Sequence, residues 1–502
     1  GLLAFRVGPT VLSTPTSAVT ISAPVEINLA NAGDDFQINP AVGNFNVTFA
    51  GDFTFTKGEF FLGDNVTGRN LTLTGKNFTM TGNSSFAAVT PAFAFVLGTL
   101  VLNPATANLP MNWSYTGAPT LGNVTVSNDV TLGGTGTGLV VYRNFLHNGG
   151  KLDFSSREIE INAVQDLDPG VPVVLAAGTF TRTVLAAPAP APTYAATSGY
   201  LVIRTAAFTQ GADFSIPNLR FGKNADAVSP TFATASAATV TKKLYIDVAA
   251  AQTITHTVTA VARLNVADMV DVYWVNGKFD VAPVYAATIN LHLMNALALA
   301  VPATVWPATA TLVSTLEVDN SASANLADSR QVNKELLLTN GNLDVATTKK
   351  LTLVDNVAIN VVDGTLNTIG TGSVVFGVGH DVTYAPTAPY GTNAELPATV
   401  KSLSFTRSAN VFNFPVSLWS SVTVEGLLDI KNDIFVGGGL SFEALGNVNI
   451  ANESADFSRA TDPVTTFFSP LTFAGSANQT VTVPEAGAAL GDLEFNKATN
   501  GN

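Results

Sequence analysis

The chain has 502 residues, of which 46% are hydrophobic and 12% are charged, and the 37 acidic residues outnumber the 24 basic ones to give a net charge of −13. The apolar fraction excludes a disordered chain, and the acidic balance repels phosphate, so we expect no nucleic-acid partner. Cysteine is absent, which excludes disulfides and thiolate metal sites and fits an exported protein.

Short strands are predicted from the first residues onward. Residues 1–24 form an N-terminal strand segment, and from Phe45 to Met80 apolar residues alternate with Thr and Asn. Such alternation places one row of side chains in a core and the other row in solvent. Gly, Asn and Asp interrupt the runs because they accept turn conformations. We expect almost no helix, and inward rows that include Phe45, Val47, Phe49, Leu351 and Leu353.

The strand pattern repeats at intervals of about 90 residues, a period that is typical of arrays. Its anchors are Val124, Leu219, Leu316, Leu403 and Leu493, which by subtraction lie 95, 97, 87 and 90 residues apart. A weaker copy begins at Val25. After residues 1–24, the sequence therefore predicts five repeats and an interrupted sixth, with the bounds 25–122, 123–218, 219–315, 316–402, 403–492 and 493–502. Repeat 2 contains an Ala- and Pro-rich stretch, 183–198, which we expect to be a loop.

Two all-β architectures fit these strands. The first is a right-handed parallel β-solenoid, or β-helix, whose coils of about 20 to 25 residues stack on one another. The second is a string of tandem β-sandwich modules, since about 95 residues is also the size of an immunoglobulin-like domain. The solenoid is favoured because the phrase apolar-Asp-apolar recurs with Asp separations of 127, 64 and 85, close to multiples of about 21. These residues are Asp153, Asp280, Asp344 and Asp429.

The most apolar stretch, from Leu291 to Val313, is predicted to form short strands. It contains Pro302 and Pro307, which disfavour a helical membrane span. We therefore expect no membrane-spanning segment.

Several phrases of the later repeats resemble a known group of proteins. They are Gly372-Ser-Val-Val-Phe376, Leu471-Thr-Phe-Ala-Gly475, Asn478-Gln-Thr-Val481 and Gly491-Asp-Leu-Glu-Phe-Asn496. This pattern is similar to the repetitive secreted surface proteins of the Bacteroidota and Ignavibacteria type. The resemblance implies a β-helical fold and an extracellular, cell-surface location, often reached through type IX secretion.

Residue patterns for catalysis or metal binding are sparse. The four histidines are isolated from one another and lack a second ligand nearby, so no metal centre or cofactor is predicted. They are His147, His256, His292 and His380.

Acidic pairs are weak candidates for chemistry. Glu158 and Glu160 would share one face of a strand, which a carbohydrate-active enzyme could use, although an exposed polar face is the favoured interpretation. The pairs Asp34-Asp35 and Asp268-Asp271 are weaker candidates for calcium. No catalytic residue is assigned, and we do not expect an enzyme.

The sequence favours a structural subunit of an extracellular filament, sheath or surface layer that polymerises head-to-tail with copies of itself. The interrupted final repeat would be completed by the N-terminal strand of the next subunit. One alternative is a β-helical adhesin that binds cell-surface glycans or other cells, and a third is a carbohydrate-active β-helix enzyme. The residues expected to carry assembly are Leu2, Leu3, Phe5, Val7, Leu493 and Phe495.

Overall fold

The computed structural model describes most of the chain. It covers residues 1–8, 10–14, 18–40, 47–62, 70–81, 84–86, 99–117, 119–135, 139–141, 145–147, 152–153, 158–161, 165–167, 172–175, 179–182, 193–196, 200–203, 208–210, 214–227, 229–230, 232–234, 238–256, 264–295, 297–307, 313–406, 416–431, 434–436, 440–450, 471–482 and 493–497.

These residues form an all-β protein with large parallel sheets, as predicted. Within the ranges above, the only helix is a 3-10 turn at Thr106–Asn108. The strands pair in parallel along the whole chain. Parallel pairing is not that of tandem immunoglobulin-like sandwiches, whose sheets are antiparallel. No helix among the described residues is long and apolar enough to cross a membrane.

The chain divides into two compact units. Unit 1 comprises residues 1–267 and 276–284, and unit 2 comprises residues 268–275 and 285–502. The bounds of the sequence repeats stay a prediction. Within the predicted loop 183–198, residues 193–196 form strand β23, which pairs with β21 (Pro172–Leu175).

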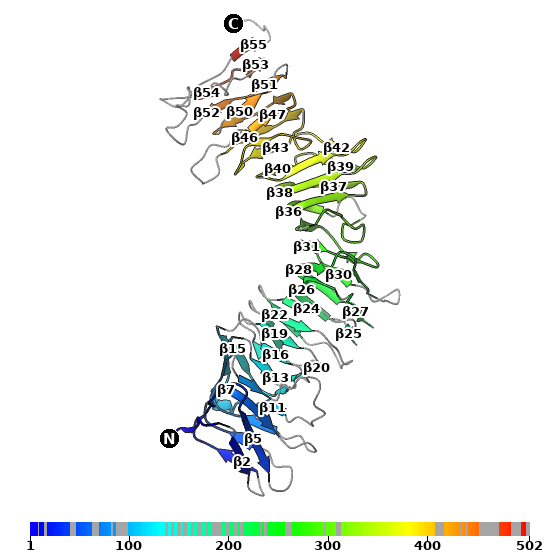
Figure 1. The fold of residues 1–502 in the computed structure, drawn as a ribbon. Helices are drawn as coiled ribbons and strands as arrows, with labels where there is room; N and C mark the ends of the chain where they lie inside the picture. Colours follow the sequence, from blue (N-terminus) through cyan, green and yellow to red (C-terminus); the bar gives the residue numbers. More distant parts are fainter. Residues whose placement is uncertain are drawn as a thin grey trace. The chain divides into compact units, whose positions relative to one another are not determined.

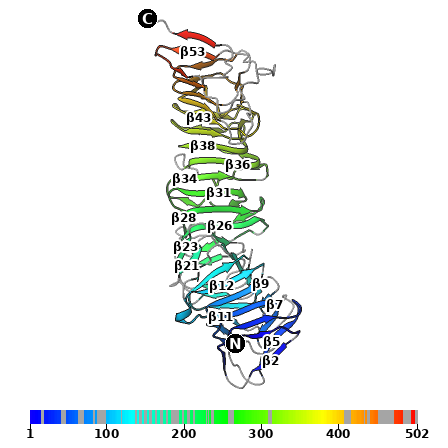
Figure 2. The same cartoon turned by 90° about the vertical axis from the view of Figure 1, so that its left-hand side faces the viewer.

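Parallel strands stack on one another through unit 1 (Figures 1 and 2). From Leu3 to Leu167 successive strands belong in turn to three such stacks. The register shows this at Val124, which pairs with Leu100 on one side and with Phe145 on the other, 24 and 21 residues away by subtraction. One of these sheets contains β3 (Val19–Ile21), β6 (Val47–Phe49), β8 (Asn70–Leu73), β11 (Thr99–Leu102), β14 (Asn123–Val126), β17 (Phe145–His147) and β20 (Gln165–Leu167).

The core of unit 1 is built from the inward residues of successive strands. Val47 and Phe49 are buried, as predicted, whereas Phe45 lies outside the described residues. Phe53, Phe78 and Trp113 occupy one register position on β7 (Phe53–Leu62), β9 (Asn77–Thr81) and β12 (Met111–Thr116). Their rings stack at centroid distances of 5.5 and 5.7 Å. Burial of such side chains contributes about 1.5–3 kcal/mol each.

Unit 2 is likewise built from stacked parallel strands, whose register partners lie at a similar separation in the sequence. Ile359 pairs with Leu336 below it and Val382 above it, 23 residues away by subtraction in each direction. The main stack contains β31 (Val270–Asn276), β34 (Ile289–Leu293), β36 (Val313–Leu326), β38 (Glu335–Val345), β40 (Ala358–Val361), β43 (Asp381–Tyr384), β46 (Ser402–Phe405), β49 (Leu428–Ile430) and β52 (Val448–Ile450).

Unit 2 also contains three smaller stacks, of which the third consists of β44 (Tyr390–Gly391), β47 (Val416–Leu418) and β50 (Ile434–Val436). The first contains β37 (Arg330–Val332), β39 (Lys350–Leu353) and β42 (Ser373–Phe376) (Figure 1). The second contains β45 (Thr399–Val400), β48 (Val422–Val424), β51 (Phe442–Ala444), β53 (Leu471–Gly475) and β55 (Leu493–Lys497). The predicted inward residues Leu351 and Leu353 are fully buried on β39.

Candidate functional site

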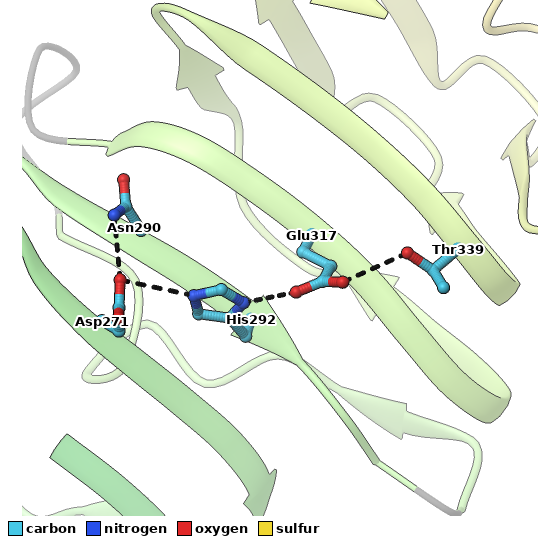
Figure 3. Close-up of polar contacts among 5 residues, drawn as sticks. All are labelled: Asp271, Asn290, His292, Glu317 and Thr339. Carbon is cyan, nitrogen blue, oxygen red and sulfur yellow. Dashed lines mark hydrogen bonds and ion pairs between the residues drawn. The ribbon is translucent and has the colours of Figure 1, made fainter. Parts of the chain in front are cut away.

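A row of polar side chains crosses four neighbouring strands of unit 2. It consists of Asp271, Asn290, His292, Glu317 and Thr339, on β31, β34, β36 and β38 (Figure 3). Alternation explains the row, because the residues between these positions point into the core, as the buried Val272 and Leu291 do.

His292 lies at the centre of the row, between two carboxylates from adjacent coils. Its Nδ1 lies 2.5 Å from Glu317 Oε2, and its Nε2 lies 3.7 Å from Asp271 Oδ1 (Figure 3). Its ring also stacks on Tyr273, with centroids 4.3 Å apart and planes 14° apart. The imidazole is therefore held by contacts to both neighbouring coils, and its side chain is only 15% exposed.

The carboxylates of Glu317 and Asp271 each accept a further hydrogen bond, from Thr339 and from Asn290. Thr339 Oγ1 donates to Glu317 Oε1 at 3.1 Å, and Asn290 Nδ2 donates to Asp271 Oδ1 at 2.9 Å. The hydrogen bond from His292 lowers the pKa of Glu317, against the effect of burial, which raises it. A lowered pKa keeps Glu317 ionised, so this part of the row is a charge-assisted contact between coils.

The row does not have the geometry of a metal or catalytic site. In the part of the chain that the structure describes, no three His, Asp or Glu side chains are grouped to hold a metal ion. The imidazole separates Asp271 from Glu317, so the two carboxylates do not face a common space. Chemically, the row connects adjacent strands of the stack through hydrogen bonds.

Similar polar contacts recur elsewhere, with an amide one coil away from a carboxylate. Asn367 Nδ2 donates to Asp344 Oδ1 at 2.9 Å, and Asn449 Nδ2 donates to Asp429 Oδ1 at 2.7 Å. In both cases the two residues are register partners on adjacent strands. Two of the four apolar-Asp-apolar phrases, those of Asp344 and Asp429, thus mark positions where an outward Asp receives an Asn from the next strand of the stack. Asp280 instead accepts hydrogen bonds from the backbone N–H groups of His256 and Val281. Alternating Asp with Asn also avoids like charges at neighbouring positions.

Sequence patterns did not indicate the buried carboxyl group of Glu395 in unit 2, which two tyrosine hydroxyls contact. Glu395 has no exposed surface, and its Oε1 accepts a hydrogen bond from Asn393 N at 2.8 Å. The hydroxyls of Tyr384 and Tyr390 lie 3.3 and 3.2 Å from the same oxygen. Burial raises the pKa of Glu395, although these hydrogen bonds act in the opposite direction. Its Oε2 has no hydrogen-bond partner among the described residues.

Of the other histidines, His256 and His380 each contact a backbone carbonyl oxygen. His256 is buried in unit 1, where its Nε2 lies 2.6 Å from Val281 O. His380 is buried in unit 2, and its Nδ1 lies 3.0 Å from Val357 O. Only the backbone of His147 is described, on strand β17.

The acidic pairs singled out from the sequence have local structural partners. Asp34 Oδ2 accepts from Asn31 N at 2.8 Å, which closes a turn. Asp268 Oδ1 accepts from the Thr288 hydroxyl at 2.7 Å, whereas Asp271 belongs to the polar row, so these two residues have different roles. The side chains of Glu158 and Glu160, on β19 (Glu158–Ile161), lie outside the described residues, and their pairing stays a prediction.

The residues expected to carry assembly lie on the first and last described strands. Leu2 is 57% exposed and Val7 is 70% exposed, on either side of β1 (Leu3–Phe5), and Leu3 is exposed as well. Phe5 is half-buried and packs edge-to-face against Phe36, with centroids 4.7 Å apart.

The last strand has a comparable surface. On β55, Phe495 is 67% exposed although it stacks on Phe473 at 5.0 Å, and Leu493 is exposed too. Among the described strands, β1 pairs with β4 (Val25–Asn28) and β55 pairs with β53. Each therefore presents apolar side chains beside an edge of its sheet.

Comparison with known proteins adds no functional assignment. No protein-family model matches the chain, and neither curated proteins nor solved structures give a significant match.

Proposed function

We propose that this chain is a structural subunit of an extracellular filament, sheath or surface layer, built as a right-handed parallel β-solenoid. The observation that carries the proposal is that β1 and β55 each combine exposed apolar side chains with a position at the edge of a parallel sheet. An edge strand with exposed apolar residues and free backbone groups is a template for pairing with another chain. The partner proposed for it is a second copy of the same chain.

The polar side chains support a structural role. In the Asp271 to Thr339 row, carboxylate, imidazole, amide and hydroxyl groups are engaged with neighbouring coils. The Asp344–Asn367 and Asp429–Asn449 hydrogen bonds likewise connect neighbouring strands of the stack. Such contacts define the register of the coils and do not present a reactive group to a substrate.

The resemblance to repetitive secreted surface proteins supports an extracellular location. It rests on turn-and-strand phrases such as Leu471-Thr-Phe-Ala-Gly475, which forms β53 beside the final described strand. The absence of cysteine is in keeping with export. In the proposed polymer, β1 of one subunit would extend the stack that ends at β55 of the next, a heterologous contact that propagates.

Sedimentation velocity of the full chain tests the proposal. We expect species larger than the monomer, and their average size should increase with protein concentration. Val7→Asp combined with Phe495→Asp should shift them toward monomer, because the substitutions place like charges in the proposed contact. Leu427→Asp is the matched control, since Leu427 is an exposed apolar residue away from β1 and β55. Equal assembly by the double variant and the control would contradict the contact.

A further inference from the structure

Strand β42 has an open edge within a continuously described part of unit 2. It is the terminal strand of the β37-β39-β42 sheet, and it pairs only with β39. On the β39 side, Ser373 N donates to Lys349 O and Gly377 N donates to Leu353 O. Because backbone groups of a strand point alternately to its two sides, those of Val374 and Phe376 point away from β39. They have no hydrogen-bond partner within residues 313–406.

The side chains beside this edge are incompletely covered. Val374 and Phe376 are in register with Leu351 and Leu353, which are fully buried, whereas Val374 and Phe376 are only half-buried, although the Phe376 ring packs on His380 at 5.7 Å. On the opposite face of the strand, Val375 is 41% exposed. An apolar strand is therefore open on its edge and partly open on both faces.

The sequence around β42 lacks the features that usually protect an edge. Residues 364–379 contain no charged residue and no proline. Natural edge strands are commonly blocked by lysine, by proline or by inward-pointing charges. In a chain of net charge −13, an uncharged run of this length lowers the repulsion between two copies. The carboxylate of Asp355 lies beyond the strand, where its Oδ1 accepts a hydrogen bond from Val378 N at 2.9 Å.

We propose that β42 is a self-pairing surface, in which the β42 strands of two copies associate antiparallel about a two-fold axis at Val375. In this register Val374 of one copy lies opposite Phe376 of the other, and these residues exchange both of their N–H···O=C bonds. Phe376 of the first copy likewise lies opposite Val374 of the second copy. Together the two pairs satisfy the outward-pointing backbone groups of Val374 and Phe376 in both copies. Val375 meets its symmetry mate in a non-hydrogen-bonded pair, where side chains approach most closely.

The two-fold arrangement explains why a second copy fits this edge. A C2 interface brings the same surface of each subunit together, so the strand must be complementary to itself. Two residues with outward-pointing backbone groups on either side of one central residue, in a run that is uncharged from 364 to 379, meet that requirement. The proposed contact uses β42 and neither β1 nor β55. It can therefore be tested independently of the proposed end-to-end assembly.

Site-directed cross-linking tests the register directly. The chain has no cysteine, so Val375→Cys introduces a single thiol. Opposed residues of a non-hydrogen-bonded antiparallel pair have Cα atoms about 4.5 Å apart, within the range of a disulfide. We expect Val375→Cys to form a covalent dimer under mild oxidation. Thr352→Cys is the matched control, because Thr352 is the register partner of Val375 on β39, whose two edges are both paired.

A second variant removes the contact. Val375→Lys places two like charges against each other at the axis, and we expect it to lower the fraction of dimer at least tenfold. Thr352→Lys should leave that fraction unchanged. Both experiments are performed in the Val7→Asp and Phe495→Asp background, so that end-to-end assembly does not contribute. A monomer at all concentrations, or cross-linking of Val375→Cys that is no faster than that of Thr352→Cys, would overturn the proposal.

Discussion

Leu353 and Phe376 occupy the same register position on adjacent strands, yet Leu353 is fully buried and Phe376 is only half-buried. The difference arises because β39 has a strand on each side, whereas β42 has one only on the β39 side among the strands that the structure describes. Within a parallel stack, a side chain is buried by the coils above and below it. The position of a residue in the stack therefore determines how much its apolar side chain contributes to the free energy of unfolding.

A pair of truncations measures this difference. Leu353→Ala should lower the free energy of unfolding by about 2–5 kcal/mol, because it leaves a cavity in a packed core. Phe376→Ala should lower the free energy of unfolding clearly less than Leu353→Ala does, when both are compared in a monomeric background that combines Val7→Asp, Phe495→Asp and Val375→Lys. Urea denaturation of unit 2 provides the measurement, and an equal or larger cost for Phe376→Ala would show that the β42 edge is covered.

The contact between His292 and Glu317 predicts a dependence of stability on acid. The pKa of Glu317 is lowered in the folded state, so its contribution is present above the unfolded pKa of about 4.3 and is lost as pH falls through the folded value. Glu317→Gln should therefore reduce the loss of unfolding free energy between pH 5 and pH 3. His292→Ala should flatten the same profile, because it removes the main cause of the shift. Unchanged profiles in both variants would contradict this role.

Glu395 predicts the opposite pH dependence. Its pKa is raised by burial, so the stability that accompanies its protonated form is present below the unfolded pKa and declines as pH rises through the folded value. Glu395→Gln keeps the acceptor oxygen but cannot ionise. We expect little change in thermal stability near pH 4 and a gain on the order of 1–3 kcal/mol at pH 8. A variant that is destabilised at pH 8 would show that the charged carboxylate is needed.

Gly341 is required where β38 bends beside Asn320. It has a φ of +71°, and an added Cβ would lie 2.0 Å from Asn320 Oδ1 and 2.2 Å from Asn320 O. Gly341→Ala should therefore destabilise unit 2 by at least about 1–3 kcal/mol. Gly33→Ala is the control, since no atom lies within 4 Å of its added Cβ and no change beyond about 0.5 kcal/mol is expected. Similar unfolding midpoints for the two variants would contradict the constraint.

The sequence predicted the repeating strands but not the contacts between coils. Alternation is a local property, so it identified inward residues such as Val47, Phe49 and Leu351, and the all-β fold followed from it. The partner of His292 could not be found in this way, because Glu317 lies 25 residues away and coil lengths vary. By subtraction, Leu428 and Val448 pair across 20 residues, whereas Phe442 and Leu471 pair across 29. Glu395 was missed because the segment around it departs from the strand pattern.

Fibre diffraction from the assembled protein tests the proposed structural role most directly. If subunits extend one another's parallel stacks, the fibres should give a meridional reflection at about 4.8 Å, the spacing of neighbouring strands along the stack. The Val7→Asp and Phe495→Asp double variant should yield no such fibres, whereas the Leu427→Asp control should. A wild-type protein that stays monomeric at high concentration, or fibres whose strands run along the axis, would contradict the account.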